Sequence, residues 1–179
     1  TGTMAAILNM SRKDITKVCK HASLRGIVQA ANYNSPGQIV ISGETVAVHY
    51  AMEIAKNLGA RKALALNVSG AFHSPLMAPA KDDLSVIIEK TKFKKAKVPV
   101  VANVDASPTS DPAKIKNNLI EQLENPVLWE DTVQYMVKDG VEEIVEIGPG
   151  KVLQGLVKRI HRDMPTGGVA NQEQLEVIS

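Results

Sequence analysis

Apolar residues in the first third of the chain follow a pattern that predicts four strands and two helices. Strands are expected over residues 3–9, 26–33, 38–42 and 62–69, where β-forming residues come in short runs. Helical spacing separates these runs twice, in the sets Ile15, Val18, Cys19, Ala22 and Val46, Tyr50, Ile54, Leu58. The resulting order β-α-β-β-α-β is the signature of a ferredoxin-like fold, in which two helices pack on one face of an antiparallel sheet.

Local signals mark where these elements begin and end. Ser11 is placed as an N-cap with Asp14 three residues further on, an arrangement worth about 1 kcal/mol of helix stability. Pro36 and Gly37 predict a tight turn, so residues 26–42 are expected to form an antiparallel hairpin. Gly59 is expected to end the second helix.

The rest of the chain alternates helices with few strands. Helices are expected over residues 76–91, 112–124, 126–139 and 149–160, and strands over 98–104 and 141–148. The segment 98–104 is almost wholly apolar, which is typical of a strand buried on both faces. This alternation predicts an α/β layer with parallel pairing, although two strands are too few for a doubly wound sheet. The polar tail 162–179 carries no expected element.

Two of these helices are expected to bury one apolar face each. The inward residues of the first are expected to be Ala80, Leu84, Ile87 and Ile88. Those of the last are expected to be Val152, Leu153, Leu156, Val157 and Ile160.

Composition adds limits on the class of protein. The 179 residues are 44% hydrophobic and 22% charged with a net charge of +2, as in an ordinary globular protein. Cys19 is the only cysteine, which excludes an intrachain disulfide framework and a multi-cysteine zinc site and favours the cytoplasm. No apolar run is long enough to span a membrane, and the Lys-rich segment 92–97 favours a solvated surface over an acidic partner or nucleic acid.

Among the four histidines, His73 is the candidate for chemistry. It follows a strand end, has small neighbours and precedes a predicted helix, which is where catalytic groups often lie. A lone histidine also often satisfies core hydrogen bonds, so position alone leaves both roles open. The other three, His21, His49 and His161, are expected on helix surfaces, and no pair has metal-ligand spacing.

A histidine base needs a nucleophile, and the sequence offers no clear one. The G-x-S-x-G elbow of the α/β-hydrolases does not occur, and Cys19 is expected to pack rather than react. The segment Gly148–Lys151 joins a strand to a helix but lacks the phosphate-loop pattern, so a tight structural turn is expected there.

Five segments together resemble a known family. "ANYNSPGQIVISG", "GAFHSPLMAPA", "VPVVANVDASP", "EQLENPVLWEDTV" and "EIGPGKVLQGLVKRI" occur in the order seen in the malonyl-CoA:acyl carrier protein transacylases of bacterial fatty acid synthesis. The resemblance implies an α/β (α+β) fold in which residues 1–69 form a ferredoxin-like βαββαβ subdomain. Residues 70–161 would then be the C-terminal part of an α/β-hydrolase-like acyltransferase core, followed by the tail 162–179.

The resemblance also implies a reaction and a set of site residues. These enzymes carry malonyl from CoA on a serine and pass it to the thiol of the acyl carrier protein, with no cofactor and no metal. His73 matches the catalytic base, and Gln122 matches the residue whose backbone carbonyl accepts the other ring N–H. Phe72 matches a position linked to malonyl acceptance, and Asn34 is expected to border the pocket.

The sequence departs from the family in one large respect. The serine in G-H-S-x-G, the arginine for the malonyl carboxylate and the oxyanion-hole donors have no counterpart in it. We therefore expect that an N-terminal portion is missing or separate, that this chain alone is inactive, and that Ala71–Leu76 and residues 98–104 expose apolar surface. The carrier-docking candidates are Lys94, Lys95, Lys151 and Lys158.

Two alternatives remain open at this point. One is an acyltransferase domain of a polyketide synthase, which shares the fold and the histidine. The other is a non-catalytic ferredoxin-like binding module.

Overall fold

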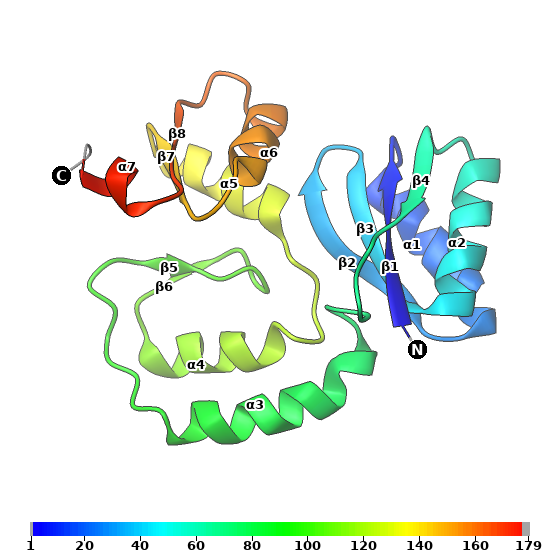
Figure 1. The fold of residues 1–179 in the computed structure, drawn as a ribbon, viewed down its shortest axis with the longest axis horizontal. Helices are drawn as coiled ribbons and strands as arrows, with labels where there is room; N and C mark the ends of the chain where they lie inside the picture. The colour runs from blue at the N-terminus through cyan, green and yellow to red at the C-terminus, as the bar shows by residue number, and fades with distance from the viewer. Residues whose placement is uncertain (1, 177–179) are drawn as a thin grey trace.

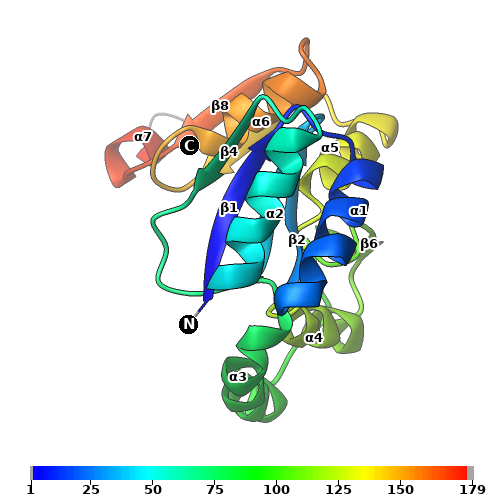
Figure 2. The same cartoon turned by 90° about the vertical axis from the view of Figure 1, so that its right-hand side faces the viewer.

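The N-terminal part of the molecule is a four-stranded antiparallel sheet with two helices on one face. The computed structural model describes residues 2–176. The strands are β1 (Gly2–Leu8), β2 (Val28–Ser35), β3 (Gln38–Glu44) and β4 (Lys62–Ala65), in the order β2-β3-β1-β4. The helices α1 (Arg12–Ala22), followed by the short η1 (Ser23–Arg25), and α2 (Thr45–Asn57) lie side by side against the sheet (Figure 2). The predicted order β-α-β-β-α-β is confirmed.

The main core lies between this sheet and its helices. Ala5 and Ile7 of β1 face the helices together with Ile39 and Ile41 of β3, because side chains two apart on a strand share a face. The four apolar residues predicted for α1 are all buried against them, and Ser11 caps the helix by accepting a hydrogen bond from the Asp14 N–H at 3.1 Å. The predicted hairpin is confirmed, with Ser35 paired to Gln38 across the turn and Gly37 at a φ of +72°.

The buried face of α2 agrees only in part with the predicted apolar spacing. Tyr50 and Ile54 pack partly buried against the core, whereas Val46 is 63% exposed and Leu58, just beyond the helix, is 61% exposed. The buried residues are instead Ala47, Val48, Ala51 and Ala55. Small side chains let the helix approach the sheet and α1 closely. The close packing gained in this way is more favourable than burying the larger apolar residues on the neighbouring face of the helix.

The remaining elements extend from the sheet as helices with short strand pairs (Figure 1). In chain order they are η2 (Pro75–Met77), α3 (Ala78–Lys90), β5 (Val100–Val101), β6 (Pro108–Thr109), α4 (Pro112–Glu121), α5 (Trp129–Lys138), β7 (Ile144–Ile147), α6 (Val152–Ile160), β8 (Thr166–Val169) and α7 (Gln172–Glu176). β5 pairs with β6 antiparallel, and β7 pairs with β8 parallel.

This pairing corrects the predicted parallel layer. The predicted strand 98–104 does not join the one near 141–148, and parallel pairing occurs between β7 and β8. β8 lies in the tail for which no element was expected, since its sequence "TGGV" has no apolar alternation. The bounds of β4 are also shorter than predicted, ending at Ala65.

Apolar side chains in this second part are exposed, which was expected for residues 98–104 but not for the inward faces predicted on α3 and α6. Val98 is 69% exposed and Val100 39%, because a two-stranded ribbon supplies no second layer to cover them. On α3 only Ile88 is buried, and Ile87 is 63% exposed. On α6, Leu156 and Val157 are buried as predicted, but Val152 is 70% exposed and Leu153 37%.

Two sets of contacts attach α5 and the segment before it to α1 and to the sheet. The Arg12 guanidinium lies 2.9 Å from a Glu130 carboxylate oxygen and 2.8 Å from one of Asp131, and it stacks 4.5 Å from the centre of the Tyr33 ring. At the outer edge of β2, the Tyr33 N–H donates to the Val127 carbonyl at 2.9 Å, and the Val127 N–H donates to the Ala31 carbonyl at 2.8 Å. The segment that leads into α5 is therefore hydrogen-bonded to the outer edge of β2.

Candidate active site

His73 lies in the irregular segment between β4 and η2, as predicted. Its φ of +58° is a left-handed backbone conformation, which costs a non-glycine residue roughly 1–2 kcal/mol. The next residue, Ser74, is fully buried, and its hydroxyl donates to the Ala71 carbonyl at 2.7 Å. The loop is thus held in a strained shape by its own buried hydrogen bond, as is common where a functional side chain must be aimed.

The structure brings His73 and Gln122 together, as the resemblance implied. His73 Nδ1 lies 2.9 Å from the backbone oxygen of Gln122, which ends α4. A carbonyl oxygen only accepts hydrogen bonds, so at this distance the proton of the neutral ring is placed on Nδ1. The lone pair is then on Nε2, the nitrogen that remains available as a base.

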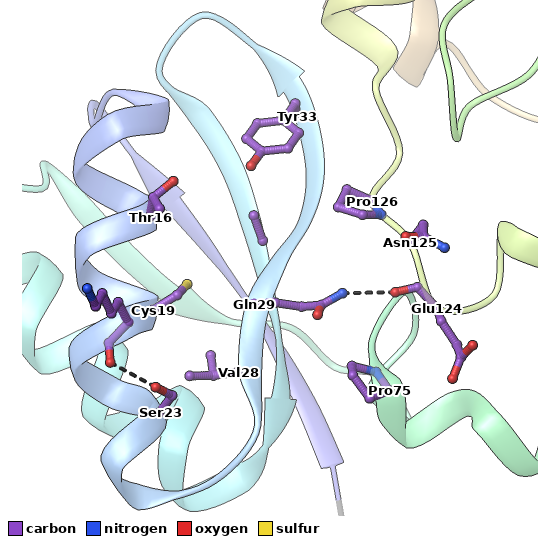
Figure 3. A pocket seen from close by; sticks show the side chains of 12 residues that line it. Thr16, Cys19, Ser23, Val28, Gln29, Tyr33, Pro75, Glu124, Asn125 and Pro126 are labelled. Carbon is purple, nitrogen blue, oxygen red and sulfur yellow. Dashed lines mark hydrogen bonds between the residues drawn. The ribbon is translucent and has the colours of Figure 1, made fainter.

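Gln29, which no pattern in the sequence indicated, supports this arrangement from β2. Its side-chain N–H₂ donates to the His73 carbonyl at 2.8 Å and to the Glu124 carbonyl at 2.9 Å. These partners lie 44 and 95 residues away along the chain, so no local pattern could have shown the contact. Figure 3 shows Gln29 reaching across a cavity of about 560 Å³ toward Glu124, with Pro75 beside it.

The other predicted site residues are placed differently. The Phe72 side chain is 41% exposed beside Gly70, where an added Cβ would lie 3.6 Å from the ring, while the adjacent Ala71 is buried against β1 at Gly2. Asn34 lies where β2 is bulged, between the pairs formed by Tyr33 and Ser35. Asn34 is five residues beyond Gln29, roughly 16 Å along the strand, and its place at the border of the pocket stays a prediction.

No nucleophile is joined to His73 in the part of the chain that the structure describes. No serine, threonine or cysteine side chain of residues 2–176 is hydrogen-bonded to its ring. Burial raises the pKa of the Cys19 thiol to about 12, so this side chain stays protonated and inert near neutral pH. The other three histidines are exposed on helices or at a helix end, as predicted.

The helix that follows the turn at Gly148–Lys151 has N–H groups near its start that are already hydrogen-bonded to a side chain of the protein. The predicted tight turn is confirmed, with Gly148 at a φ of +148° and Gly150 at +91°. The Glu146 carboxylate accepts the N–H groups of Leu153 and Gln154 at 3.1 Å each. Burial alone would raise the pKa of Glu146, but these bonds at the start of α6 lower it.

Two further observations concern the described residues 2–176. No group of three or more His, Cys, Asp or Glu side chains there is arranged to hold a metal ion. No helix among them has the length and apolar character that crossing a membrane requires.

The chain matches one family over nearly its whole length. The model for the acyl transferase domain matches residues 1–178. The malonyl CoA-acyl carrier protein transacylase of Bacillus subtilis (strain 168) is 45% identical over 177 residues, and that of Staphylococcus aureus (strain COL) is 39% identical over 176. Both alignments cover 98% of this chain, but the chain spans only 56% and 57% of those proteins.

Solved structures agree with this match. An acyl carrier protein S-malonyltransferase from Vibrio cholerae is 41% identical and superposes with a TM-score of 0.94, covering 100% of this chain and 58% of that one. A malonyl-transacylase solved in complex with its type II PKS acyl-carrier protein is also 41% identical, with a TM-score of 0.93 and coverage of 99% and 57%. The fold is therefore the mixed α/β fold of these structures, and the chain belongs to the acyl transferase domain family.

Proposed function

We propose that this chain supplies the base of an enzyme that transfers malonyl from malonyl-CoA to acyl carrier protein. The observation that carries the proposal is the 2.9 Å contact between His73 Nδ1 and the Gln122 carbonyl, which leaves Nε2 free to accept a proton. Relatives named as malonyl transacylases, at 39–45% identity, support the choice of acyl group and carrier. No resident cofactor has a part in the proposal, and a cytoplasmic location stays a prediction.

In the proposed reaction, His73 moves one proton in each direction. Nε2 takes the proton of a serine hydroxyl as its oxygen bonds to the malonyl carbonyl carbon. The carbon–sulfur bond to CoA then breaks, and the thiolate receives the proton from Nε2. A base of this kind contributes roughly 10²–10⁴-fold in rate. Transfer to the carrier thiol runs through the same steps in reverse.

The nucleophilic serine would come from polypeptide that is not part of this sequence. No G-x-S-x-G motif occurs in the chain, and the chain spans about 57% of the relative from S. aureus. The two-stranded β7–β8 pair supports the same inference, because parallel strands are normally covered on both faces, yet Ile147 is 80% exposed. The exposed apolar residues of α3, β7 and α6 are the surface that such a portion would cover.

We further propose the finer description of the fold. The sheet order β2-β3-β1-β4 with two helices on one face fits a ferredoxin-like subdomain over residues 1–69. Residues 70–161 would be the C-terminal part of an α/β-hydrolase-like core, with 162–179 as a tail. In the assembled site, Phe72 would fill space beside the acyl group, and Asn34 would border the pocket further along β2.

The four lysines predicted as candidates for carrier docking lie in two separate places. Lys94 and Lys95 lie in the segment after α3, far from Lys151 and Lys158 at the two ends of α6 (Figure 1). Lys158 is also engaged, since its ammonium donates to the Met164 carbonyl at 2.6 Å. These four residues therefore offer no single patch.

A more concentrated positive site lies at the tip of the β2–β3 hairpin. Arg61 and Arg159 line a polar cavity of about 370 Å³ whose other lining residues include Asn9, Ser35 and Gln38 but no carboxylate. Gln38 accepts a hydrogen bond from the Arg159 guanidinium and holds it in place. We propose this tip as the part of the chain that meets the phosphate groups of CoA.

Co-expression tests the proposed function. The chain would be produced together with a polypeptide carrying a G-H-S-x-G motif from a relative, and transfer of labelled malonyl to acyl carrier protein would be measured. Transfer that needs both polypeptides and His73 supports the proposal. A well-folded complex that transfers nothing removes it and leaves the binding module.

One relative favours a second candidate within the same class. The complex with a type II PKS acyl-carrier protein raises the acyltransferase of polyketide synthesis as the alternative. Comparing transfer rates to carrier proteins of the two pathways in the co-expressed complex distinguishes them.

A further inference from the structure

We infer that Gln29 is a positioning residue that selects the ring tautomer of His73. Its importance for catalysis rests on the proposed function, whereas its effect on the ring is a property of this chain alone. The inference starts from one side chain that holds two backbone carbonyls, one in each of the segments that form the His73–Gln122 contact.

The Gln29 amide carries two N–H groups, and both are used. One donates to the His73 carbonyl at 2.8 Å and the other to the Glu124 carbonyl at 2.9 Å, and Figure 3 shows the second of these bonds. Two carbonyl dipoles directed at the same point repel each other unless a donor lies between them. Gln29 therefore stabilises the close contact between the His73 loop and the segment at Glu124, whose carbonyls would otherwise repel each other.

Two groups of Gln122 compete for the same ring nitrogen. The backbone oxygen lies 2.9 Å from His73 Nδ1, and the side-chain nitrogen Nε2 lies 3.3 Å from it. The two contacts cannot both be hydrogen bonds in a neutral ring. The oxygen requires a proton on Nδ1, whereas the amide can donate only to an Nδ1 lone pair.

The outcome of this competition decides whether the ring can act as a base. With the backbone oxygen bound, the lone pair is on His73 Nε2, which can accept a proton. With the Gln122 side chain bound, the proton is on His73 Nε2 instead, and that nitrogen cannot serve. The shorter distance to the oxygen indicates that the first arrangement holds in this structure.

Gln29 favours the backbone oxygen because it fixes backbone positions. Glu124 is two residues beyond Gln122, and the carbonyl that Gln29 holds in His73 belongs to a residue at a strained φ of +58°. If the His73 ring moves, the flexible side chain of Gln122 can stay in contact with it, whereas the Gln122 backbone carbonyl cannot. Loss of Gln29 should therefore shift the ring toward the amide-bound tautomer.

Lys81 provides a matched control for this role. It lies on α3 and pairs with Glu121 at 3.0 Å and Glu124 at 2.7 Å, so it also ties η2–α3 to the end of α4. It contacts carboxylates rather than the two carbonyls. Removing it loosens the same region without releasing the carbonyl of His73.

Nitrogen-15 NMR of the His73 ring in the full chain tests the inference. The spectrum is recorded at a pH above which the ring shifts no longer change, so that the ring is neutral and its two nitrogen shifts report the tautomer ratio. The resonance is assigned by its loss in His73→Gln. We expect the Nδ1–H tautomer to dominate in the wild type and in Lys81→Met. In Gln29→Met and in the isosteric Gln29→Glu, its ratio to the other tautomer should fall at least tenfold.

A double variant separates positioning from general loosening. Gln122→Met removes the competing amide but keeps the backbone carbonyl, so Gln29→Met/Gln122→Met should recover most of the Nδ1–H form. An unchanged tautomer in whichever Gln29 variant folds, judged by its backbone amide spectrum, would overturn the inference, as would an equal shift in Lys81→Met. Because no serine or malonyl group takes part in this measurement, its result is independent of whether the proposed transfer occurs.

Discussion

His73 Nδ1 and the backbone oxygen of Gln122 lie 2.9 Å apart although 49 residues separate them in the chain. The contact forms entirely within this chain, between the loop after β4 and the end of α4. The orientation of this proposed base is therefore set within the chain itself. Preorganisation of this kind reduces the reorganisation that the reaction would otherwise need.

The first prediction concerns His73 in the complex with a serine-bearing partner. His73→Ala should lower malonyl transfer at least a hundredfold, within the 10²–10⁴ range of a general base, while thermal unfolding of the complex stays within a few degrees. His49→Ala on the exposed face of α2 is the matched control and should transfer normally. Near-normal turnover of His73→Ala would remove this residue from the mechanism.

The second prediction concerns the chain by itself. Incubation with labelled malonyl-CoA should give no covalent acyl-protein, because no described nucleophile contacts His73 and the Cys19 thiol has a pKa of about 12. Mass spectrometry of the intact protein is the measurement. A stoichiometric mass increase of one malonyl group would contradict it, and the Cys19→Ala variant would show whether the thiol was responsible.

The third prediction concerns acid pH and Glu146. Its pKa is lowered in the folded protein by the N–H groups of α6 that it accepts, against the opposing effect of burial. A lowered carboxylate pKa adds stability above the unfolded value, near 4.3, which is lost as pH falls through the folded value. Hydrogen exchange at the Leu153 and Gln154 amides should accelerate between about pH 5 and about pH 3 relative to the intrinsic rate. Glu146→Gln should remove most of that pH dependence, and a parallel change in both proteins would argue against this role.

The fourth prediction separates the exposed apolar face from the core. Ile87→Gln on α3 should reduce concentration-dependent association of the chain, measured by analytical ultracentrifugation, without lowering thermal stability, because Ile87 is 63% exposed. Ile15→Ala in α1 should instead cost about 2–5 kcal/mol of unfolding free energy, since Ile15 is fully buried. Equal association of Ile87→Gln and the wild type would exclude this part of the surface from the interaction.

The fifth prediction compares two glycines. A Cβ at Gly43 in β3 would overlap the Ile27 carbonyl, so Gly43→Ala should force β2 away from β3 and lower stability by at least about 2 kcal/mol. Gly155 in α6 has nothing within 4 Å of an added Cβ, so Gly155→Ala should raise stability by about 0.5–1 kcal/mol. Denaturant unfolding measures both, and a stabilised Gly43→Ala would show that the strands can separate at little cost.

The sequence-based predictions were accurate where local interactions decide the structure and less accurate where contacts between distant residues decide it. α1 was predicted with its cap and all its buried residues, because periodicity and capping are local. The buried face of α2 was misplaced by about one position, since close packing of alanines decided it. β8 was missed because pairing with β7, rather than its own composition, makes it a strand. The His73–Gln122 contact came from family resemblance, whereas Gln29 had no signal of either kind.

The bulged hairpin of β2 and β3 has a consequence for the chemistry at its far end. Successive side chains on a strand point to opposite faces, so a slip of one residue in β2 would turn Gln29 away from the two carbonyls. The register of β2 against β3 is determined by the pairing that begins at the Pro36–Gly37 turn and continues through both bulges. A register error at the hairpin tip would therefore separate Gln29 from the His73 loop, together with turning the buried side chains of β2 out of the core.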